Sequence, residues 1–350
     1  AVIIGEVIFG KIFKNFALRL LAVAFGGIIY YVVMQFVISL GLNTDDLKLL
    51  TAAIVAVFLG IPYLKGQYAQ KHIKIKEVRT MLEIKNVHKT FNPNTINEKK
   101  ALRGIDLVLN EGDFVTVIGG NGAGKSTMLN MIAGVYPVDC GTITVDGIDV
   151  TKLPEHKRAK YIGRVFQDPM NGTAADMQIL ENLALAKRRG NHRGLAFGVT
   201  KKEKEEYVKV LKSLDLGLET RLTSKVGLLS GGQRQAVTLL MATLKKPKIL
   251  LLDEHTAALD PKTAKKVLDL TEKIVARDNL TTIMITHNMK DAINIGNRLI
   301  MMNEGKIIYD VSGEEKKNLT TADLLAKFKV TSGGEEFDND RVLLSTEADE

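Results

Sequence analysis

The glycine-rich segment from Gly119 to Thr127 constrains this chain more than any other part of its sequence. It reads Gly-Gly-Asn-Gly-Ala-Gly-Lys-Ser-Thr and fits the pattern GxxxxGK[ST]. The mainly apolar residues 113–118 before it favour a buried strand, and the apolar run 128–133 after it favours a helix. A strand, a glycine-rich loop and a helix in this order predict a loop whose backbone N–H groups surround phosphate groups. A glycine-rich turn without a ligand would not need the lysine and the serine.

The residue types in this loop suit a nucleotide with several phosphates. Glycines let the backbone turn inward, and the helix that follows directs the positive end of its dipole at the anion. Lys125 can reach the β- and γ-phosphates, and the Ser126 hydroxyl can bind Mg²⁺. The residues expected to hold the phosphates are Gly119, Asn121, Gly122, Gly124, Lys125, Ser126 and Thr127.

A second apolar run, residues 249–252, ends in the carboxylates Asp253 and Glu254. Four apolar residues suit a parallel strand that is buried on both faces. Any strand can end in acids, so this pair alone is weak evidence. Together with the phosphate loop it predicts a hydrolytic site, in which Asp253 is linked to Mg²⁺ through water and Glu254 polarises the attacking water.

The segment Leu229–Gln235, Leu-Ser-Gly-Gly-Gln-Arg-Gln, precedes that strand and closely resembles the signature of the ATP-binding cassette (ABC) family. Its serine and glycines offer donors and close backbone approach at a helix N-terminus. In the family these residues contact ATP held by a second ATPase domain, which implies two ATP molecules between two domains. The residues concerned here are Ser230, Gly231, Gly232 and Gln233.

Four further positions match family elements in the correct order. The resemblance implies that Phe91 stacks on adenine and that Gln167 contacts the metal and links to a permease. It implies that Asp260 belongs to the D-loop and that His287 lies near the γ-phosphate. In isolation each residue has an ordinary structural explanation, as a core aromatic or as a polar group at a turn or strand end. Their order along the chain makes those explanations improbable together.

The resemblance covers residues 81–330 and implies an α/β fold, a P-loop NTPase core with a mixed sheet plus a helical subdomain at about 168–245. It also implies ATP and Mg²⁺ as cofactors. The expected catalytic residues are Glu254, His287, Lys125 and Gln167, and the expected metal ligands are Ser126, Gln167 and Asp253. One departure is His255, where the family more often has proline or another small residue.

Two uncharged apolar segments, residues 20–42 and 49–64, precede this domain. A helix as long as the first segment spans a bilayer core of roughly 30 Å. Residues 1–80 carry nine Lys/Arg and four Asp/Glu, so they hold +5 of the net charge of +8. The basic residues flank the apolar pair and the loop between holds only acids, which places both outer ends in the cytoplasm. We expect a transmembrane hairpin within 1–64 and a basic cytoplasmic linker at 65–80; a buried soluble hairpin is the alternative. Residues 331–350 read as an acidic polar tail.

Residues 1–64 also resemble the C-terminal end of a permease of the branched-chain amino-acid or ribose importer type, mainly on the stretch Gly5–Gly10 before the hairpin. The chain begins within apolar sequence, like the interior of a longer membrane protein. Two spans cannot form a permeation pathway. The chain is therefore expected either to join the end of a permease to its partner ATPase, or to be a two-span anchored ATPase that works with separate permeases.

These features predict ATP hydrolysis that energises import of a small solute, such as an amino acid, nucleoside or sugar, across the cytoplasmic membrane. The implied partners are a second ABC ATPase domain in a homodimer, transmembrane permease subunits and an extracytoplasmic solute-binding protein. The nearly neutral balance of residues 81–350 argues against nucleic acid, and the single Cys140 fits a reducing compartment. The alternatives are a non-transport ABC ATPase of translation or repair and a membrane-anchored module that binds ATP without turnover. The single cassette argues against the first, and Glu254 and His287 argue against the second.

Overall fold

The computed structural model describes residues 79–191 and 198–331, together with scattered positions between Ala24 and Gly41. The chain divides into two compact units, Ala1–Glu77 and Val78–Glu350. Most of the predicted hairpin and linker, and the predicted tail beyond Thr331, lie outside the described residues. The described positions of the first unit up to Ser39 are helical. Within the described part of the chain, no helix has both the length and the apolar character needed to cross a membrane.

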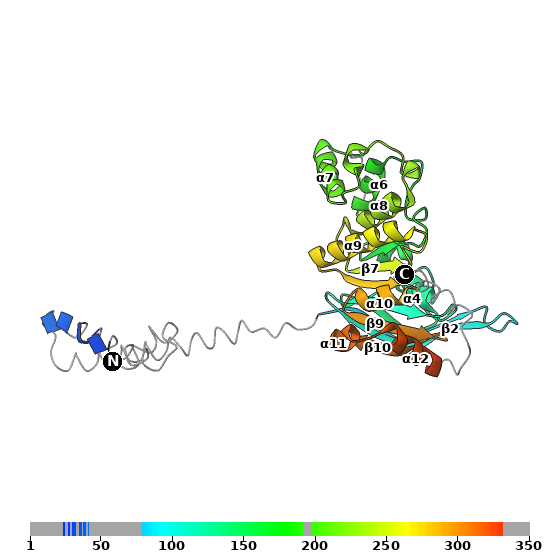
Figure 1. Cartoon of the computed structure of the whole chain (residues 1–350), viewed down its shortest axis with the longest axis horizontal. Helices are drawn as coiled ribbons and strands as arrows, with labels where there is room; N and C mark the ends of the chain where they lie inside the picture. The colour runs from blue at the N-terminus through cyan, green and yellow to red at the C-terminus, as the bar shows by residue number, and fades with distance from the viewer. Residues whose placement is uncertain are drawn as a thin grey trace. The chain divides into compact units, whose positions relative to one another are not determined.

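A six-stranded mixed sheet lies at the centre of the second unit (Figure 1), in the order β10-β9-β3-β8-β7-β6. All neighbours pair in parallel except β10, which is antiparallel to β9. This agrees with the predicted mixed sheet. The strands are β3 (Phe114–Gly119), β6 (Ile162–Val165), β7 (Ile249–Asp253), β8 (Thr281–Ile285), β9 (Arg298–Asn303) and β10 (Lys306–Ser312).

The central strands are apolar along their length because both faces of the sheet are covered. On β7, Ile249 and Leu251 belong to the core that contains helix α4 (Lys125–Ala133). The alternate residues Leu250 and Leu252 belong to a separate core with helix α9 (Pro261–Asp278). Strand side chains alternate between faces, so the unbroken apolar run seen in the sequence serves both helix layers.

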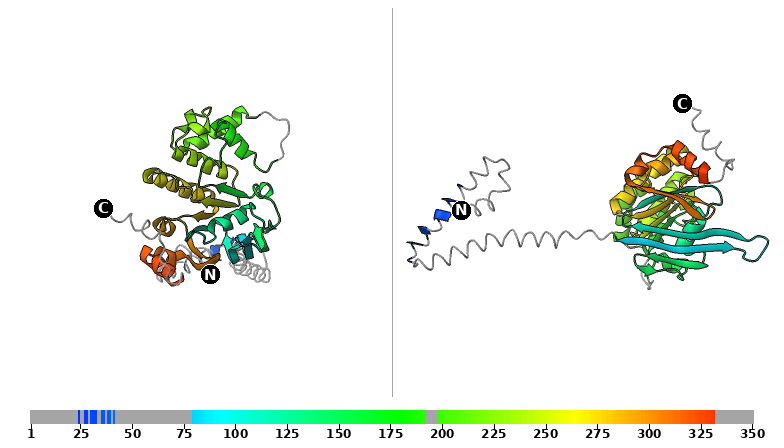
Figure 2. Two further views of the ribbon diagram at one scale, coloured as in Figure 1. Left: turned by 90° about the vertical axis from the view of Figure 1, so that its right-hand side faces the viewer. Right: turned by 90° about the horizontal axis from the view of Figure 1, so that it is seen from below.

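A four-stranded antiparallel sheet, in the order β2-β1-β4-β5, packs into the same core as α4. Its long first hairpin reaches beyond the rest of the unit in Figure 2 and brings Phe91 opposite Lys99 near its tip. The strands are β1 (Thr80–Phe91), β2 (Lys99–Asn110), β4 (Cys140–Val145) and β5 (Ile148–Asp149).

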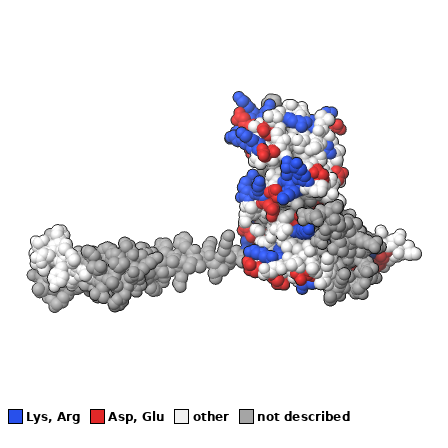
Figure 3. Space-filling model, viewed as in Figure 1, with Lys and Arg blue, Asp and Glu red and all other residues white. Residues whose placement is uncertain are grey.

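The helical subdomain has its own apolar core and contains α6 (Ile179–Lys187), α7 (Lys201–Lys212) and α8 (Gly231–Thr243). It occupies the upper part of the unit in Figure 1. On the face drawn in Figure 3 its basic side chains are interspersed with acidic ones.

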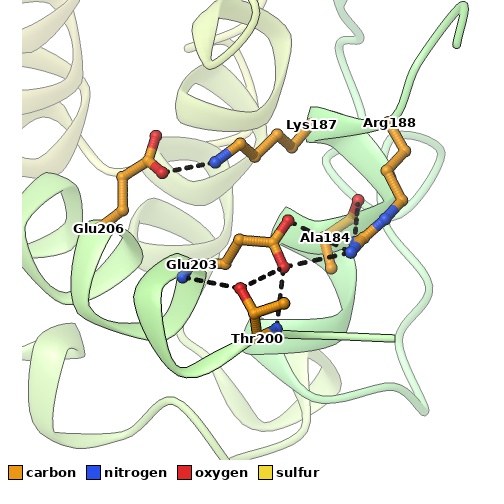
Figure 4. Close-up of polar contacts among 6 residues, drawn as sticks. All are labelled: Ala184, Lys187, Arg188, Thr200, Glu203 and Glu206. Atoms are coloured by element: carbon orange, nitrogen blue, oxygen red, sulfur yellow. Dashed lines mark hydrogen bonds and ion pairs between the residues drawn. The ribbon is translucent and has the colours of Figure 1, made fainter. Parts of the chain in front are cut away.

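Polar contacts fasten the end of α6 to the start of α7 (Figure 4). Arg188 Nη2 lies 3.2 Å from both carboxylate oxygens of Glu203, and Lys187 pairs with Glu206 at 2.5 Å. The Thr200 hydroxyl accepts a hydrogen bond from the Glu203 backbone, and the Glu203 carboxylate accepts one from the Thr200 backbone. This capping box satisfies orphan N–H groups at the start of α7.

The remaining elements are short or lie at the C-terminal side of the unit. They are α5 (Glu155–Arg158), two 3₁₀ turns (Leu218–Thr220 and Val226–Leu228), α10 (Met289–Asn294), α11 (Gly313–Lys317) and α12 (Thr321–Thr331).

Candidate functional site: a nucleotide pocket

The loop between β3 and α4 has a positive φ, which favours glycine, at three positions. Gly119 has φ +151°, Gly122 +83° and Gly124 +101°. A Cβ added at Gly119 would lie 2.3 Å from the Met302 carbonyl oxygen, and one at Gly124 would lie 2.7 Å from that of Ala101. The carbonyl groups of Met302 and Ala101 thus pack against the outer side of the loop, and the loop backbone surrounds the space in front of α4. This is the cradle that phosphate groups require.

Lys125 is held in place at the start of α4. Its Nζ donates to the carbonyl oxygens of Gly119 at 2.6 Å and Gly120 at 3.1 Å. The residue is only 6% exposed, and this burial lowers the pKa of Lys125, although the nearby carboxylates Glu254 and Asp253 oppose the shift. A buried ammonium with acidic neighbours is well placed to neutralise the β- and γ-phosphates of a nucleotide.

The loop opens into a pocket of about 290 Å³. Its lining includes nine predicted residues: Phe91, Asn121, Gly122, Gly124, Lys125, Ser126, Thr127, Glu254 and His287. The Phe91 ring packs edge-on against Tyr136, with centroids 5.2 Å apart, which fixes an aromatic face at the pocket mouth. An aromatic wall beside a cationic phosphate cradle fits a purine nucleotide.

The lining also contains four residues that were not predicted from the sequence: Lys99, Ala101, Gly120 and Ala123. Gly120 and Ala123 belong to the loop and could have been included with it. Lys99 and Ala101 come from β2, and only the pairing of β2 with β1 brings them to the pocket. A hairpin predicted after Phe91 is the sequence feature that could have indicated Lys99 and Ala101.

Glu254 and His287 meet at the carboxyl edge of the sheet. They follow the neighbouring parallel strands β7 and β8, and His287 Nε2 lies 2.7 Å from Glu254 Oε1. The hydrogen bond from His287 lowers the pKa of Glu254, so this carboxylate stays ionised. Glu254 has φ +47°, an unusual conformation for a residue with a side chain, and its carboxylate reaches the pocket. An ionised, oriented carboxylate can act as a general base.

Asp253 is not among the residues that line the pocket; it lies beside Arg164 on β6, with Nη2 and Oδ2 3.5 Å apart. Burial raises the pKa of Asp253, and the charge of Arg164 opposes this. Among the described residues, no three His, Cys, Asp or Glu side chains gather into a metal-binding group. Mg²⁺ at nucleotide sites needs only one or two protein oxygens plus the phosphates, so Ser126 and Asp253 fit such an ion. Gln167 is exposed just beyond β6 and does not line the pocket.

The signature residues form a well-capped helix start. Ser230 Oγ accepts from the Gln233 backbone at 3.3 Å, and Gln233 Oε1 accepts from the Ser230 backbone at 3.2 Å. Ser230 and Gly231 are exposed, whereas Gly232 is buried against α9. A Cβ at Gly232 would lie 2.1 Å from Thr263 Cγ2, so this glycine lets α8 and α9 approach closely.

The signature and the nucleotide pocket are separate in this chain. Ser230, Gly232 and Gln233 line a different groove of about 420 Å³, together with residues of α9. Asp260 is the N-cap of α9 and accepts from the Thr263 backbone at 3.0 Å. Asp260 also does not line the nucleotide pocket. The separation agrees with a signature that acts on nucleotide bound elsewhere.

His255, the departure seen in the sequence, points away from the pocket. It is 2% exposed, and its Nε2 lies 3.1 Å from Thr271 Oγ1 on α9. The Thr271 hydroxyl itself donates to the Val267 carbonyl, so the imidazole is the donor to Thr271. Burial lowers the pKa of His255 to about 4, and the ring is neutral. This contact fastens the turn after Glu254 to α9.

The fold and the pocket together define a P-loop nucleoside triphosphatase whose helical subdomain carries an ABC-type signature. The family model described as "ABC transporter" matches residues 102–257. Over 250 residues the chain is 46% identical to the tyrosine transport ATP-binding protein of Clostridioides difficile (strain R20291), covering 71% of this chain and 99% of that protein. The chain belongs to the ABC transporter ATP-binding family and is an ATPase that energises transport.

Another relative and two solved structures are also similar to this chain and support the family assignment. The chain is 34% identical to the xylose/arabinose import ATP-binding protein XylG of Sulfolobus acidocaldarius, over 71% of this chain and 94% of that protein. The dimeric post-hydrolysis structure of the cassette MJ0796 with ADP and Pi has a TM-score of 0.58 and 32% identity, over 66% of this chain and 98% of that one. The ADP conformation of the cassette MJ1267 has a TM-score of 0.60 and 28% identity, over 72% and 98%.

Proposed function

We propose that this chain is the ATPase of an importer for a small solute, and that the solute is an amino acid. The main support is the match to a tyrosine transport ATP-binding protein, which extends over 99% of that relative. The nucleotide pocket and the Glu254–His287 pair are intact, as turnover requires. No residue of the ATPase reads the solute, so the substrate class rests on this relationship.

The proposed reaction is transfer of the γ-phosphoryl group of ATP to water, giving ADP and phosphate. Phe91 stacks on the adenine, and the loop with Lys125 holds the phosphates. Ser126 and Asp253 would hold Mg²⁺, which would neutralise developing charge on the phosphates, and Gln167 would join them only if it moved from its exposed position toward the pocket. Glu254 accepts a proton from the attacking water, and His287 orients both the carboxylate and the γ-phosphate.

Two copies are proposed to complete two sites. The signature of one chain lies apart from its own pocket, and its Ser230 and Gly231 are exposed for a partner. The related cassette MJ0796 has a dimeric structure. Glu254→Gln should keep ATP binding, abolish most turnover and accumulate an ATP-bound dimer, which size-exclusion chromatography with and without ATP measures. A variant that hydrolyses ATP at the wild-type rate would exclude Glu254 as the base.

The permease side is proposed to lie on the helical subdomain near Gln167. Met170 is 43% exposed and Leu228 72% exposed. Arg234 bridges their two segments, because its guanidinium contacts Met170 Sδ and donates to the Gly227 carbonyl at 2.8 Å. Exposed apolar side chains on a surface whose segments are held together by such contacts are suited to bind another protein. Met170 also follows Gln167 closely in the chain, so this surface is positioned to respond to nucleotide.

Residues 1–64 are proposed to be a membrane hairpin that resembles the end of a permease. In its described helical positions, Ile28, Tyr31, Val32 and Phe36 are each more than half exposed, as lipid-facing side chains would be. The ATPase would then lie at the cytoplasmic face, with a solute-binding protein on the other side. The intact mass of the protein from its native source tests the fusion: a mass near that of residues 81–350 alone would reject it.

The transport proposal is tested by uptake. Cells that lack this gene are complemented with the wild type or with Glu254→Gln, and uptake of labelled tyrosine, spermidine and xylose is measured. We expect tyrosine uptake to be lost and to be restored only by the wild type. Loss of spermidine or xylose uptake instead would reject an amino acid as the solute. Unchanged uptake of all three, with normal ATPase activity of the purified protein, would reject this import function.

A further inference from the structure

Lys99 is a pocket residue that no recognised motif includes. It is the first residue of β2, stands opposite Phe91 in the hairpin and lines the nucleotide pocket. Its Nζ lies 3.7 Å from the position that a Cβ on Gly122 of the phosphate loop would occupy. The ammonium therefore extends from the aromatic side of the pocket to the glycine loop.

The charges around Lys99 leave its ammonium available. The next residue, Lys100, forms an ion pair with Glu98 at 3.9 Å. Lys125 interacts electrostatically with the carboxylates of Glu254 and Asp253. No acidic side chain in residues 79–191 or 198–331 forms an ion pair with Lys99. A cation directed into a pocket without an anion from the protein is suited to meet an anion from the ligand.

We propose that Lys99 forms an ion pair with the phosphate chain of the bound nucleotide at its α-phosphate end. The inference rests on ATP binding by this family and on two contacts of the proposed function. Under the proposed function, Phe91 would hold the adenine at one end of the pocket, and Lys125 with the loop would hold the β- and γ-phosphates at the other. The sugar and the α-phosphate would lie between these contacts, which is where Lys99 reaches.

The exposure of Lys99 to solvent limits how much this ion pair can contribute to nucleotide affinity. Lys99 is an exposed side chain, and an exposed ion pair changes an equilibrium by up to about fivefold. The contact should weaken as salt screens it. It should act mainly on affinity, because its proposed partner, the α-phosphate, does not react in hydrolysis.

ADP binding to purified protein tests this directly, because ADP binding by one chain does not require transport or a partner's signature. We expect Lys99→Ala to raise the Kd for ADP about fivefold at low ionic strength and to change it less at high ionic strength. Lys99→Glu should raise the Kd further, and Lys99→Arg should restore it. Lys100→Ala is the matched control, because it removes the same charge from the same hairpin next to an acidic partner.

Equal ADP affinities of Lys99→Ala and Lys100→Ala would overturn the proposal. A loss of affinity that is the same at low and high ionic strength would also overturn it, because an ion pair must be screened. Urea midpoints of both variants equal to that of the wild type establish that the comparison concerns folded protein. The KM for ATP should rise in parallel with the Kd, and a fall in kcat with unchanged KM would contradict a binding role.

Discussion

Replacement of Arg158 by methionine tests how the phosphate-loop helix is held in place. Arg158 is 1% exposed, and its guanidinium donates four hydrogen bonds to carbonyl oxygens. Two acceptors, Met131 at 2.7 Å and Ile132 at 2.9 Å, belong to the last turn of α4. The other two, Leu153 at 2.7 Å and Thr151 at 2.9 Å, belong to the segment that leads into α5. The side chain therefore joins α4 to its neighbour and satisfies carbonyls that a helix end leaves unpaired.

The size of the effect follows from these bonds. A hydrogen bond from a charged donor contributes about 1.5–3 kcal/mol, so four bonds set an upper limit of roughly 6–12 kcal/mol. Burial of the guanidinium has a cost, which also lowers the pKa of Arg158, and methionine fills part of the volume without that cost. In the variant, water could reach the carbonyls of Leu153 and Thr151, whose hydrogen bonds are only partly buried. We expect Arg158→Met to lower the free energy of unfolding by about 3–5 kcal/mol.

Urea denaturation followed by circular dichroism measures this change. Arg277→Met is the control, because Arg277 is a surface residue that pairs with its neighbour Asp278, and its loss should cost less than about 1 kcal/mol. Equal midpoints for the two variants would refute the reasoning and would mean that water replaces the guanidinium at no cost. Addition of ADP should raise the urea midpoints of both variants, since a ligand stabilises the folded state by mass action.

Two further changes follow from particular contacts. Gly232→Val places a side chain where Thr263 Cγ2 is only 2.1 Å from the Cβ position. We therefore expect lower stability in denaturation experiments and loss of the ATP-dependent dimer in size-exclusion chromatography. Adding Thr263→Ala to this variant should recover part of both. His255 has a folded pKa of about 4, below the ordinary value of 6.5. Its contribution to stability is therefore complete above pH 6.5 and is lost as pH falls toward 4. Between pH 7 and pH 5 the wild type should lose about 2 kcal/mol more than His255→Gln, whose amide does not titrate. Equal losses in urea titrations would refute the assignment of a buried neutral imidazole.

Local sequence patterns were sufficient to predict the structure of motifs that are formed by contiguous residues. The segment Gly119–Thr127 was placed on a loop between a strand and a helix, and it forms that loop. The apolar run before Asp253 was expected to be a strand covered on both faces, as β7 is. These predictions succeed because glycine conformation, strand alternation and helix capping depend on neighbours only a few residues away.

Pairings between distant segments needed the fold. Nothing in the order of residues states that β7 and β8 are neighbours, and this adjacency brings His287 to Glu254. The separation of Ser230 from the nucleotide pocket was implied by family resemblance and not by spacing. Gln167 and Asp260 were expected at the nucleotide, yet neither lines the pocket within a single chain.

The sequence by itself determined the chemistry of this protein: a phosphate loop, two carboxylates at a strand end and a signature helix, each written in contiguous residues. The tertiary structure decided which side chains share the pocket. It brought Lys99 to the phosphate loop through a hairpin, buried Arg158 beneath α4 and directed His255 toward Thr271. The physical reason is that a local motif needs only the backbone geometry of adjacent residues, whereas a contact between remote residues depends on how whole strands and helices pack.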